Sequence, residues 1–242
     1  MLISEILTHI KAADVDTKLQ YHDTLNPKFW DDRDQLIPDV RKHMLDIAEQ
    51  YRIFLNLPKD SVHDIIFTGS NANYNWTSLS DVDVHVVADL SHLQSDYLED
   101  YLKAKKDLWN SKHKITIHGY DVELYAQDED EKIKAGGIYS LIDDEWKVHP
   151  VMRQPSFDEF SVRTKSASIM DSINSIEDKG SDALDKALEL KEKIKKMRKS
   201  GLEKGGEFST EALVFKVLRN NGYLDKLSEL ILKLQDERLS LT

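Results

Sequence analysis

Two carboxylates interrupt an apolar run in the segment DVDVHVV, at Asp81 and Asp83. Alternate residues of a β-strand point to the same side, so these two side chains share one face and the intervening valines share the other. Two ionised carboxylates within several ångströms repel each other, and a hard divalent cation removes that cost. Mg²⁺ usually binds one or two carboxylates together with phosphate oxygens of a substrate, and Mn²⁺ is an alternative ion. The pair therefore predicts a metal site that acts on a phosphate ester.

A Gly-Ser pair, Gly69 and Ser70, ends the short apolar segment HDIIFT that precedes these acids. Glycine permits close backbone approach to a ligand, and backbone N–H groups together with the serine hydroxyl can hold phosphate oxygens. We therefore expect Gly69 and Ser70 to bind the phosphates of a nucleotide.

A further acid follows in the segment DVEL, which has strand character. Such a carboxylate on a neighbouring strand gives a second ion a place about 4 Å from the first, and two ions clamp the attacking and leaving oxygens of an in-line displacement. Asp121 and Glu123 share one face by alternation. Only Glu123 is flanked by clearly apolar residues, Val122 and Leu124, so Glu123 is the preferred third ligand and Asp121 the alternative.

These three parts, in this order, resemble the signature of the DNA polymerase β-like nucleotidyltransferase superfamily, over residues Ser61 to Ala126. In that family the Gly-Ser turn binds the nucleotide phosphates and the first two acids hold both metal ions. The third acid ligates the catalytic ion and can serve as the base. A glutamate as the third acid departs from the more usual aspartate, which weakens the inference to a replicative polymerase and leaves small transferases open.

The resemblance implies an α+β fold, in which a small mixed sheet with helices is followed by an all-α C-terminal domain. It implies a Mg²⁺-dependent enzyme, with two ions, that transfers a nucleoside monophosphate from an NTP to an acceptor hydroxyl and releases pyrophosphate. Neither the base of the NTP nor the acceptor has a local signature, so RNA or tRNA, a protein and a small hydroxyl compound all remain open. Two other functions also remain open: a non-catalytic nucleotide- or RNA-binding protein with this fold, and a toxin- or defence-type transferase that modifies tRNA or a protein.

Two further features have a functional and a structural interpretation. His85 lies on the carboxylate face, where it either contacts a phosphate or belongs to a strand at the sheet edge. The segment from Lys186 to Lys204 is rich in Lys and Arg, and such a run is either a solvated helix face or a contact for RNA or triphosphate.

Composition limits the remaining classes. The net charge of -11 disfavours a protein whose whole surface wraps nucleic acid, because each phosphate contact needs a Lys or Arg. The chain has no cysteine, which excludes disulfides and thiolate metal sites and indicates a cytoplasmic protein. It contains no apolar run of about 20 residues, so we expect no membrane span.

Hydrophobic periodicity predicts the elements that position these residues. We expect a catalytic domain over residues 1–150 and a helical domain over residues 151–242, joined by a Pro-containing linker at 149–157. In the first domain the patterns predict helices at 35–55 and 91–110, strands at 63–67, 81–88 and 115–126, and a strand or hairpin at 136–148. In the second they predict helices at 166–176 and 182–200, a Gly-rich loop at 202–209, and a helical hairpin from residue 210 that turns at 220–222.

Overall fold

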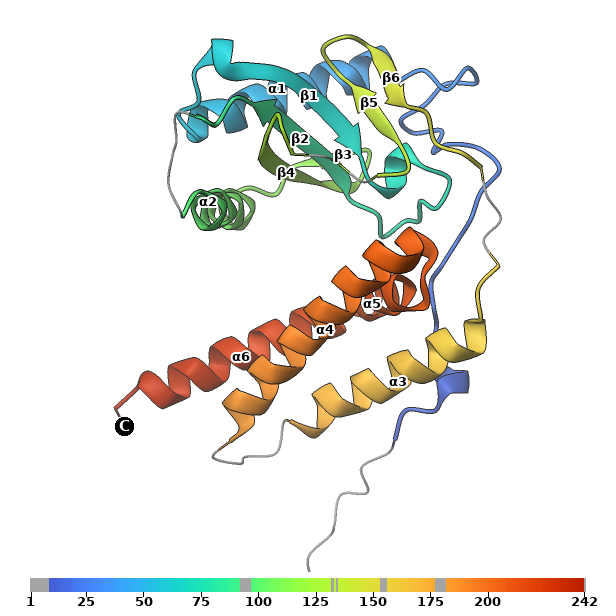
Figure 1. Cartoon of the computed structure of the whole chain (residues 1–242), viewed down its shortest axis with the longest axis vertical. Coiled ribbons are helices and arrows are strands. Elements are labelled where there is room, and N and C mark those ends of the chain that lie inside the picture. The colour runs from blue at the N-terminus through green and yellow to red at the C-terminus, as the bar shows by residue number, and fades with distance from the viewer. Residues whose placement is uncertain are drawn as a thin grey trace, which may run out of the picture. The chain divides into compact units, whose positions relative to one another are not determined.

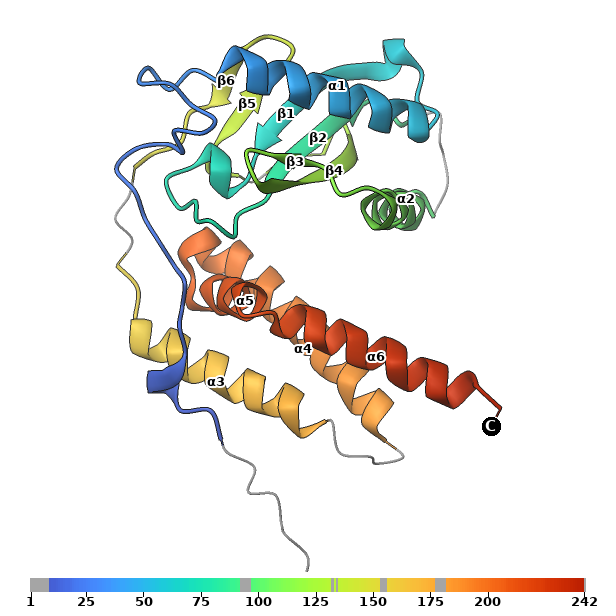
Figure 2. The same ribbon diagram turned by 180° about the vertical axis from the view of Figure 1, so that it is seen from behind.

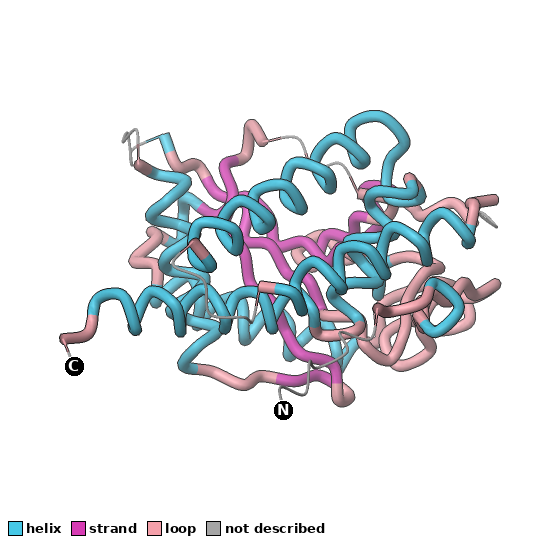
Figure 3. The backbone as a smooth tube through the Cα atoms, turned by 90° about the horizontal axis from the view of Figure 1, so that it is seen from below, coloured by secondary structure: helices cyan, strands magenta, loops and turns pink. Residues whose placement is uncertain are grey.

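The computed structural model describes residues 9–91, 97–131, 133, 135–152, 156–176 and 182–241 (Figure 1). It comprises two compact units, which we name the sheet unit, Gln20–Gln154, and the helical unit, Met1–Leu19 with Pro155–Thr242. The fold class expected from the sequence is confirmed, since a mixed sheet with helices is followed by helices alone. Among the described residues, all strands lie before residue 149. Figure 3 distinguishes these strands, in magenta, from the helices, in cyan.

The sheet unit is built on a six-stranded sheet in the order β3-β4-β2-β1-β5-β6. The pair β2 and β4 is parallel, whereas the other neighbouring strands are antiparallel. The strands are β1 (Val62–Thr68), β2 (Val82–Ala88), β3 (Thr116–Ile117), β4 (Tyr120–Asp128), β5 (Ile138–Ser140) and β6 (Glu145–Val148).

Helix α1 (Pro38–Phe54) covers the valine face of the sheet (Figure 2). Its apolar stripe, Val40, Met44, Ala48 and Tyr51, is buried in the same core cluster as the valines of β2. Helix α2 (Leu98–Lys112) lies alongside β4 and contributes the buried Trp109 to this core. Helix α1 therefore packs on the valine face and not on the opposite face, which carries the acids.

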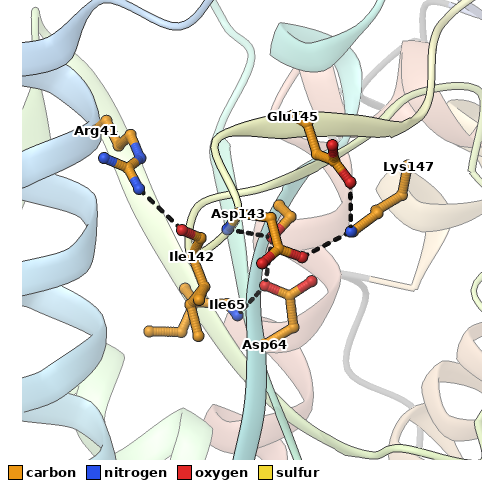
Figure 4. A network of polar contacts seen from close by, with 8 residues as sticks. Arg41, Asp64, Ile65, Ile142, Asp143, Glu145 and Lys147 are labelled. Carbon is orange, nitrogen blue, oxygen red and sulfur yellow. Dashed lines mark hydrogen bonds and ion pairs between the residues drawn. The ribbon is translucent and has the colours of Figure 1, made fainter.

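Polar contacts join the central strand β1 to the hairpin of β5 and β6 (Figure 4). The carboxylate of Asp64 accepts hydrogen bonds of 2.7 Å from the Ser140 hydroxyl and from the backbone N–H of Ile65. Lys147 pairs with Asp143 at 2.6 Å. Burial is the main reason why the pKa of Asp64 is raised, and the nearby charge of Asp143 adds to it, while the two hydrogen bonds act in the opposite direction.

The prediction of one strand over 115–126 was wrong, because this segment is a hairpin of β3 and β4. Ile117 pairs with Tyr120, so the connection is the two-residue turn His118-Gly119. Both turn residues have positive φ, 52° and 85°, which is the backbone of a type I′ hairpin turn. Gly119 therefore permits the tight turn between the two strands.

The helical unit contains α3 (Glu159–Ser175), α4 (Ala183–Gly205), α5 (Thr210–Asn220) and α6 (Tyr223–Leu239). The hairpin of α5 and α6 is as predicted, with Gly222 left-handed at φ 74° between them. Helix α3 begins earlier than predicted because Asp158 caps it by accepting from the N–H of Ser161. The predicted loop at 202–209 was wrong in its first half, since α4 continues to Gly205 before Gly206, at φ 70°, ends it.

The N-terminal segment packs against these helices. Val15 is buried in the helical core, and the carbonyls of Asp16 and Lys18 accept hydrogen bonds from Asn221 and Asn220. The expected division put all of residues 1–150 in one domain, whereas the described part of the N-terminal segment, residues 9–19, groups with the helices. Part of the expected linker (153–155) and the start of the predicted 91–110 helix (92–96) lie outside the described residues. No described helix is long and apolar enough to span a membrane.

Candidate active site

The parallel pairing of β2 and β4 brings the predicted acids together. Asp83 is the register partner of Glu123, and Val82 is the partner of Val122. Paired positions on neighbouring strands are about 4.8 Å apart. This register therefore puts Val82 and Val122 on one face of the sheet, and the Asp83 and Glu123 side chains side by side on the other face.

The phenol of Tyr125 contacts Glu123, one of the three predicted ligands. Burial is the largest cause of the strongly raised pKa of this phenol, and the negative charges of Asp83, Glu123 and Asp81 raise it further. The phenol therefore stays protonated, and it donates a hydrogen bond to Oε2 of Glu123. Asp81 directly precedes β2, and its charge is the weakest of the three that raise this pKa.

Asp121 occupies a different position from Glu123, although both are on one face. It is exposed and pairs with Thr116 of the short strand β3. The ladder with β2 begins one residue later, at Val122. Glu123 is thus the acid within the parallel ladder, and the choice between the two as a metal ligand remains a prediction.

Gly69 abuts the carboxylate of Asp83. Its backbone lies at φ 79° and ψ -163°, a region that is essentially restricted to glycine. A Cβ at this position would stand 1.9 Å from Oδ2 of Asp83 and 2.8 Å from its Cγ. The turn therefore needs glycine for two reasons, its backbone conformation and the room it leaves for the carboxylate.

The hydroxyl of Ser70 takes part in a short chain of polar groups. It donates to Oγ of Ser80 at 2.7 Å, and Ser80 Oγ also accepts from the backbone N–H of Thr77 at 2.9 Å. These contacts tie the Gly-Ser turn to the end of the loop that leads into Asp81. The Gly69-Ser70 turn and the segment just before β2 are thus joined by hydrogen bonds.

Three residues that the sequence analysis did not single out support the same turn. The Asn71 amide donates to the carbonyl of Asp81 at 2.9 Å, and its Oδ1 accepts from Asn26 at 2.8 Å. The indole of Trp30 donates to the carbonyl of Asn71 at 2.7 Å. The polar loop NANYN contained a signal for Asn71, whereas nothing local pointed to Asn26 or Trp30, because both reach the turn from a distant part of the chain.

Lys106 of α2 also reaches the site without a signal in the sequence. Its Nζ lies 3.4 Å from Oε2 of Glu123 and 3.6 Å from the ring centroid of Tyr125.

His85 also stacks on Tyr125, with 4.5 Å between the two ring centroids. Its Nδ1 lies 2.6 Å from Oε1 of Gln127. Burial is the main cause of the lowered pKa of His85, and the charge of Lys106 lowers it further. The sheet-edge interpretation of His85 was wrong, because β2 lies between β4 and β1.

The chemistry of the donors fits a hard divalent cation. The three acids offer only carboxylate oxygens, which suit Mg²⁺ or Mn²⁺. Among the residues that the structure describes, no three His, Asp or Glu side chains converge closely enough to hold an ion. Lys106 and Tyr125 both contact Oε2 of Glu123, so a cation at that oxygen would compete with the Lys106 ammonium group.

Comparisons with known proteins do not establish a family. No protein-family model matches the chain, and no curated protein matches it. Among solved structures, a match is the STING-associated CdnE c-di-GMP synthase from Capnocytophaga granulosa, at 14% sequence identity and a TM-score of 0.23, covering 84% of each chain. Because that TM-score is too low to establish a shared fold, function is inferred below from the residues of this chain.

Proposed function

We propose that the chain is a metal-dependent nucleotidyltransferase, which transfers a nucleoside monophosphate from an NTP to an acceptor hydroxyl and releases pyrophosphate. The observation that supports this most is the parallel register of Asp83 with Glu123, beside the Gly69 turn that abuts Asp83. Acids on two strands and a backbone turn for phosphate, all on one sheet face, are what an in-line displacement at phosphorus needs.

Each residue has a role in this reaction. Gly69 and Ser70 bind the triphosphate through backbone N–H groups and the hydroxyl, next to the acids. Asp81, Asp83 and Glu123 hold two Mg²⁺ or Mn²⁺ ions, which when bound neutralise phosphate charge and favour the in-line displacement. Asp121 is the alternative third ligand.

The acceptor oxygen attacks the α-phosphorus and forms the new P–O bond. The bond between the α-phosphorus and the oxygen that bridges to the β-phosphate breaks, and its electron pair leaves with pyrophosphate. Glu123 accepts the proton of the acceptor hydroxyl, since its carboxylate lies one strand away from Asp83, which the Gly69 turn abuts.

Pyrophosphate release tests this proposal. Each of the four NTPs, labelled at the α-phosphate, is incubated with protein and Mg²⁺, alone and with RNA, protein or small hydroxyl compounds as acceptor. We expect pyrophosphate and one labelled product, both lost in Asp83→Asn. A labelled tRNA or protein would identify the toxin- or defence-type branch of the same chemistry.

A non-catalytic nucleotide- or RNA-binding protein is the second candidate. One observation favours it: among the described residues the three acids do not converge closely enough to hold an ion, and Glu123 contacts Lys106 and Tyr125 instead. A folded protein that binds NTP but releases no pyrophosphate with any acceptor would establish this second function and refute the first.

A further inference from the structure

Lys106 differs from its neighbour on α2 in what its ammonium group contacts. Its Nζ lies 3.4 Å from Oε2 of Glu123, the oxygen that also accepts from Tyr125. The Nζ of Lys105 instead lies 4.7 Å from the ring centroid of Phe54, on the side of α1. Of these two lysines, Lys106 is therefore the one that adds positive charge to the acids.

An ammonium group and a divalent cation compete for this oxygen. A Mg²⁺ ion lies about 2.1 Å from a carboxylate ligand, so an ion on Oε2 of Glu123 would stand within a few ångströms of the Lys106 Nζ. Two positive charges at such a separation repel each other. Tyr125 carries no charge and can keep its hydrogen bond to Glu123 beside a bound ion.

We infer that Lys106 is a positioning residue that holds Glu123 in the metal-free protein and has to release it before a divalent cation binds there, an inference that rests on the proposed nucleotidyltransferase function. Release is physically accessible, since the Lys106 and Glu123 side chains are 23% and 37% exposed. Lysine carries a compact charge on a flexible stem and can exchange one anion for another.

The triphosphate is the anion that Lys106 would bind instead. Gly69 abuts Asp83, and Asp83 is the ladder partner of Glu123, so phosphates on the Gly69 turn lie about two strand spacings, roughly 10 Å, from Glu123. Phosphates of a nucleotide held by this turn would compete with Glu123 for the Lys106 ammonium group, and Glu123 would then be available to a cation. In the absence of nucleotide, Lys106 keeps the affinity of the site for cations low.

Mn²⁺ binding without nucleotide tests this role apart from catalysis. Free Mn²⁺ is measured by electron paramagnetic resonance during titration of the full chain and its variants, after circular dichroism has shown that each is folded. Lys106→Met, which keeps the stem but removes the charge, should bind Mn²⁺ about fivefold more tightly, as expected for loss of a partly exposed ion pair. Lys106→Arg should retain the wild-type affinity, and Lys105→Met is the matched control that should not change it.

The outcomes separate this inference from the proposed function. If Asp83→Asn loses Mn²⁺ binding but Lys106→Met binds no more tightly than the wild type, the role of Lys106 is refuted and the metal site stands. Equal tightening by Lys106→Met and Lys106→Arg also refutes it, because the effect would not depend on charge. If the wild type binds Mn²⁺ no better than Asp83→Asn, the metal site is refuted, and the role of Lys106 falls with it.

Discussion

Replacing Gly69 by alanine tests whether the turn is shaped for the carboxylate of Asp83. The added Cβ would stand 1.9 Å from Oδ2 and 2.8 Å from Cγ of Asp83, in a backbone conformation with φ 79° and ψ -163°. The carboxylate is the outer end of a side chain and can rotate away, so the clash is relieved by displacing the very group that is proposed to bind metal.

The backbone conformation accounts for most of the expected loss of stability. A non-glycine residue in this region costs of order 1–3 kcal/mol, and displacing Asp83 adds to it, so we expect a loss of about 3 kcal/mol in the free energy of unfolding. For a unit of this size, that lowers the melting temperature by roughly 10 °C. Nucleotidyl transfer should be lost even at temperatures at which the variant is folded, because Asp83 no longer occupies its place beside the turn.

Gly119→Ala is the matched control within the sheet unit. Gly119 also has positive φ, 85°, but a Cβ there would meet no atom within 4 Å. We expect a loss of about 1–2 kcal/mol from the left-handed backbone alone. Chemical denaturation followed by tryptophan fluorescence, together with pyrophosphate release, compares the two variants.

A double-mutant cycle with Asp83→Ala gives the result that would refute this reasoning. That substitution removes the Cγ and Oδ2 atoms and leaves only the Asp83 Cβ, which is 3.2 Å from the added methyl group. Gly69→Ala should then cost about 1 kcal/mol less than in the wild-type background. Strictly additive losses, or a Gly69→Ala loss no larger than that of Gly119→Ala, would show that the turn is not shaped for this carboxylate.

Four further substitutions test acidic residues, three in the candidate active site and one at Asp64. Asp83→Asn should abolish nucleotidyl transfer and leave stability unchanged or slightly higher, because one of several close negative charges is gone; a folded variant with normal pyrophosphate release contradicts the metal site. Glu123→Gln should lower turnover by several orders of magnitude while nucleotide binding persists, and Asp121→Asn should change little; the reverse result makes Asp121 the third ligand. Burial raises the pKa of Asp64, so its ionised form destabilises the fold at neutral pH, and this penalty disappears as pH falls through the raised value toward the unfolded value of about 4. Asp64→Asn should therefore raise the melting temperature at pH 7 by an amount that shrinks as pH approaches 4, and a gain independent of pH would refute that explanation.

Local periodicity was sufficient for the elements that it specifies directly. The spacing of Val40, Met44, Ala48 and Tyr51 predicted α1, and these residues are buried as one stripe. It was insufficient where a short turn interrupts a pattern of strand-forming residues, as at Gly119, because two short strands and one long strand have nearly the same composition. Neither the start of α3 nor the end of α4 followed from periodicity, since capping and glycine conformation decide them.

The sequence by itself determined that Asp81 and Asp83 lie on one face of a strand, because side chains alternate with a period of two. It also determined that glycine precedes the serine of the turn. Only the tertiary structure decided that Asp83 pairs with Glu123 and abuts Gly69, and that Lys106 reaches Glu123 from α2. Strand register and helix position depend on burying the apolar faces of segments far apart in the chain, and that long-range packing leaves no periodic signal at the acids themselves.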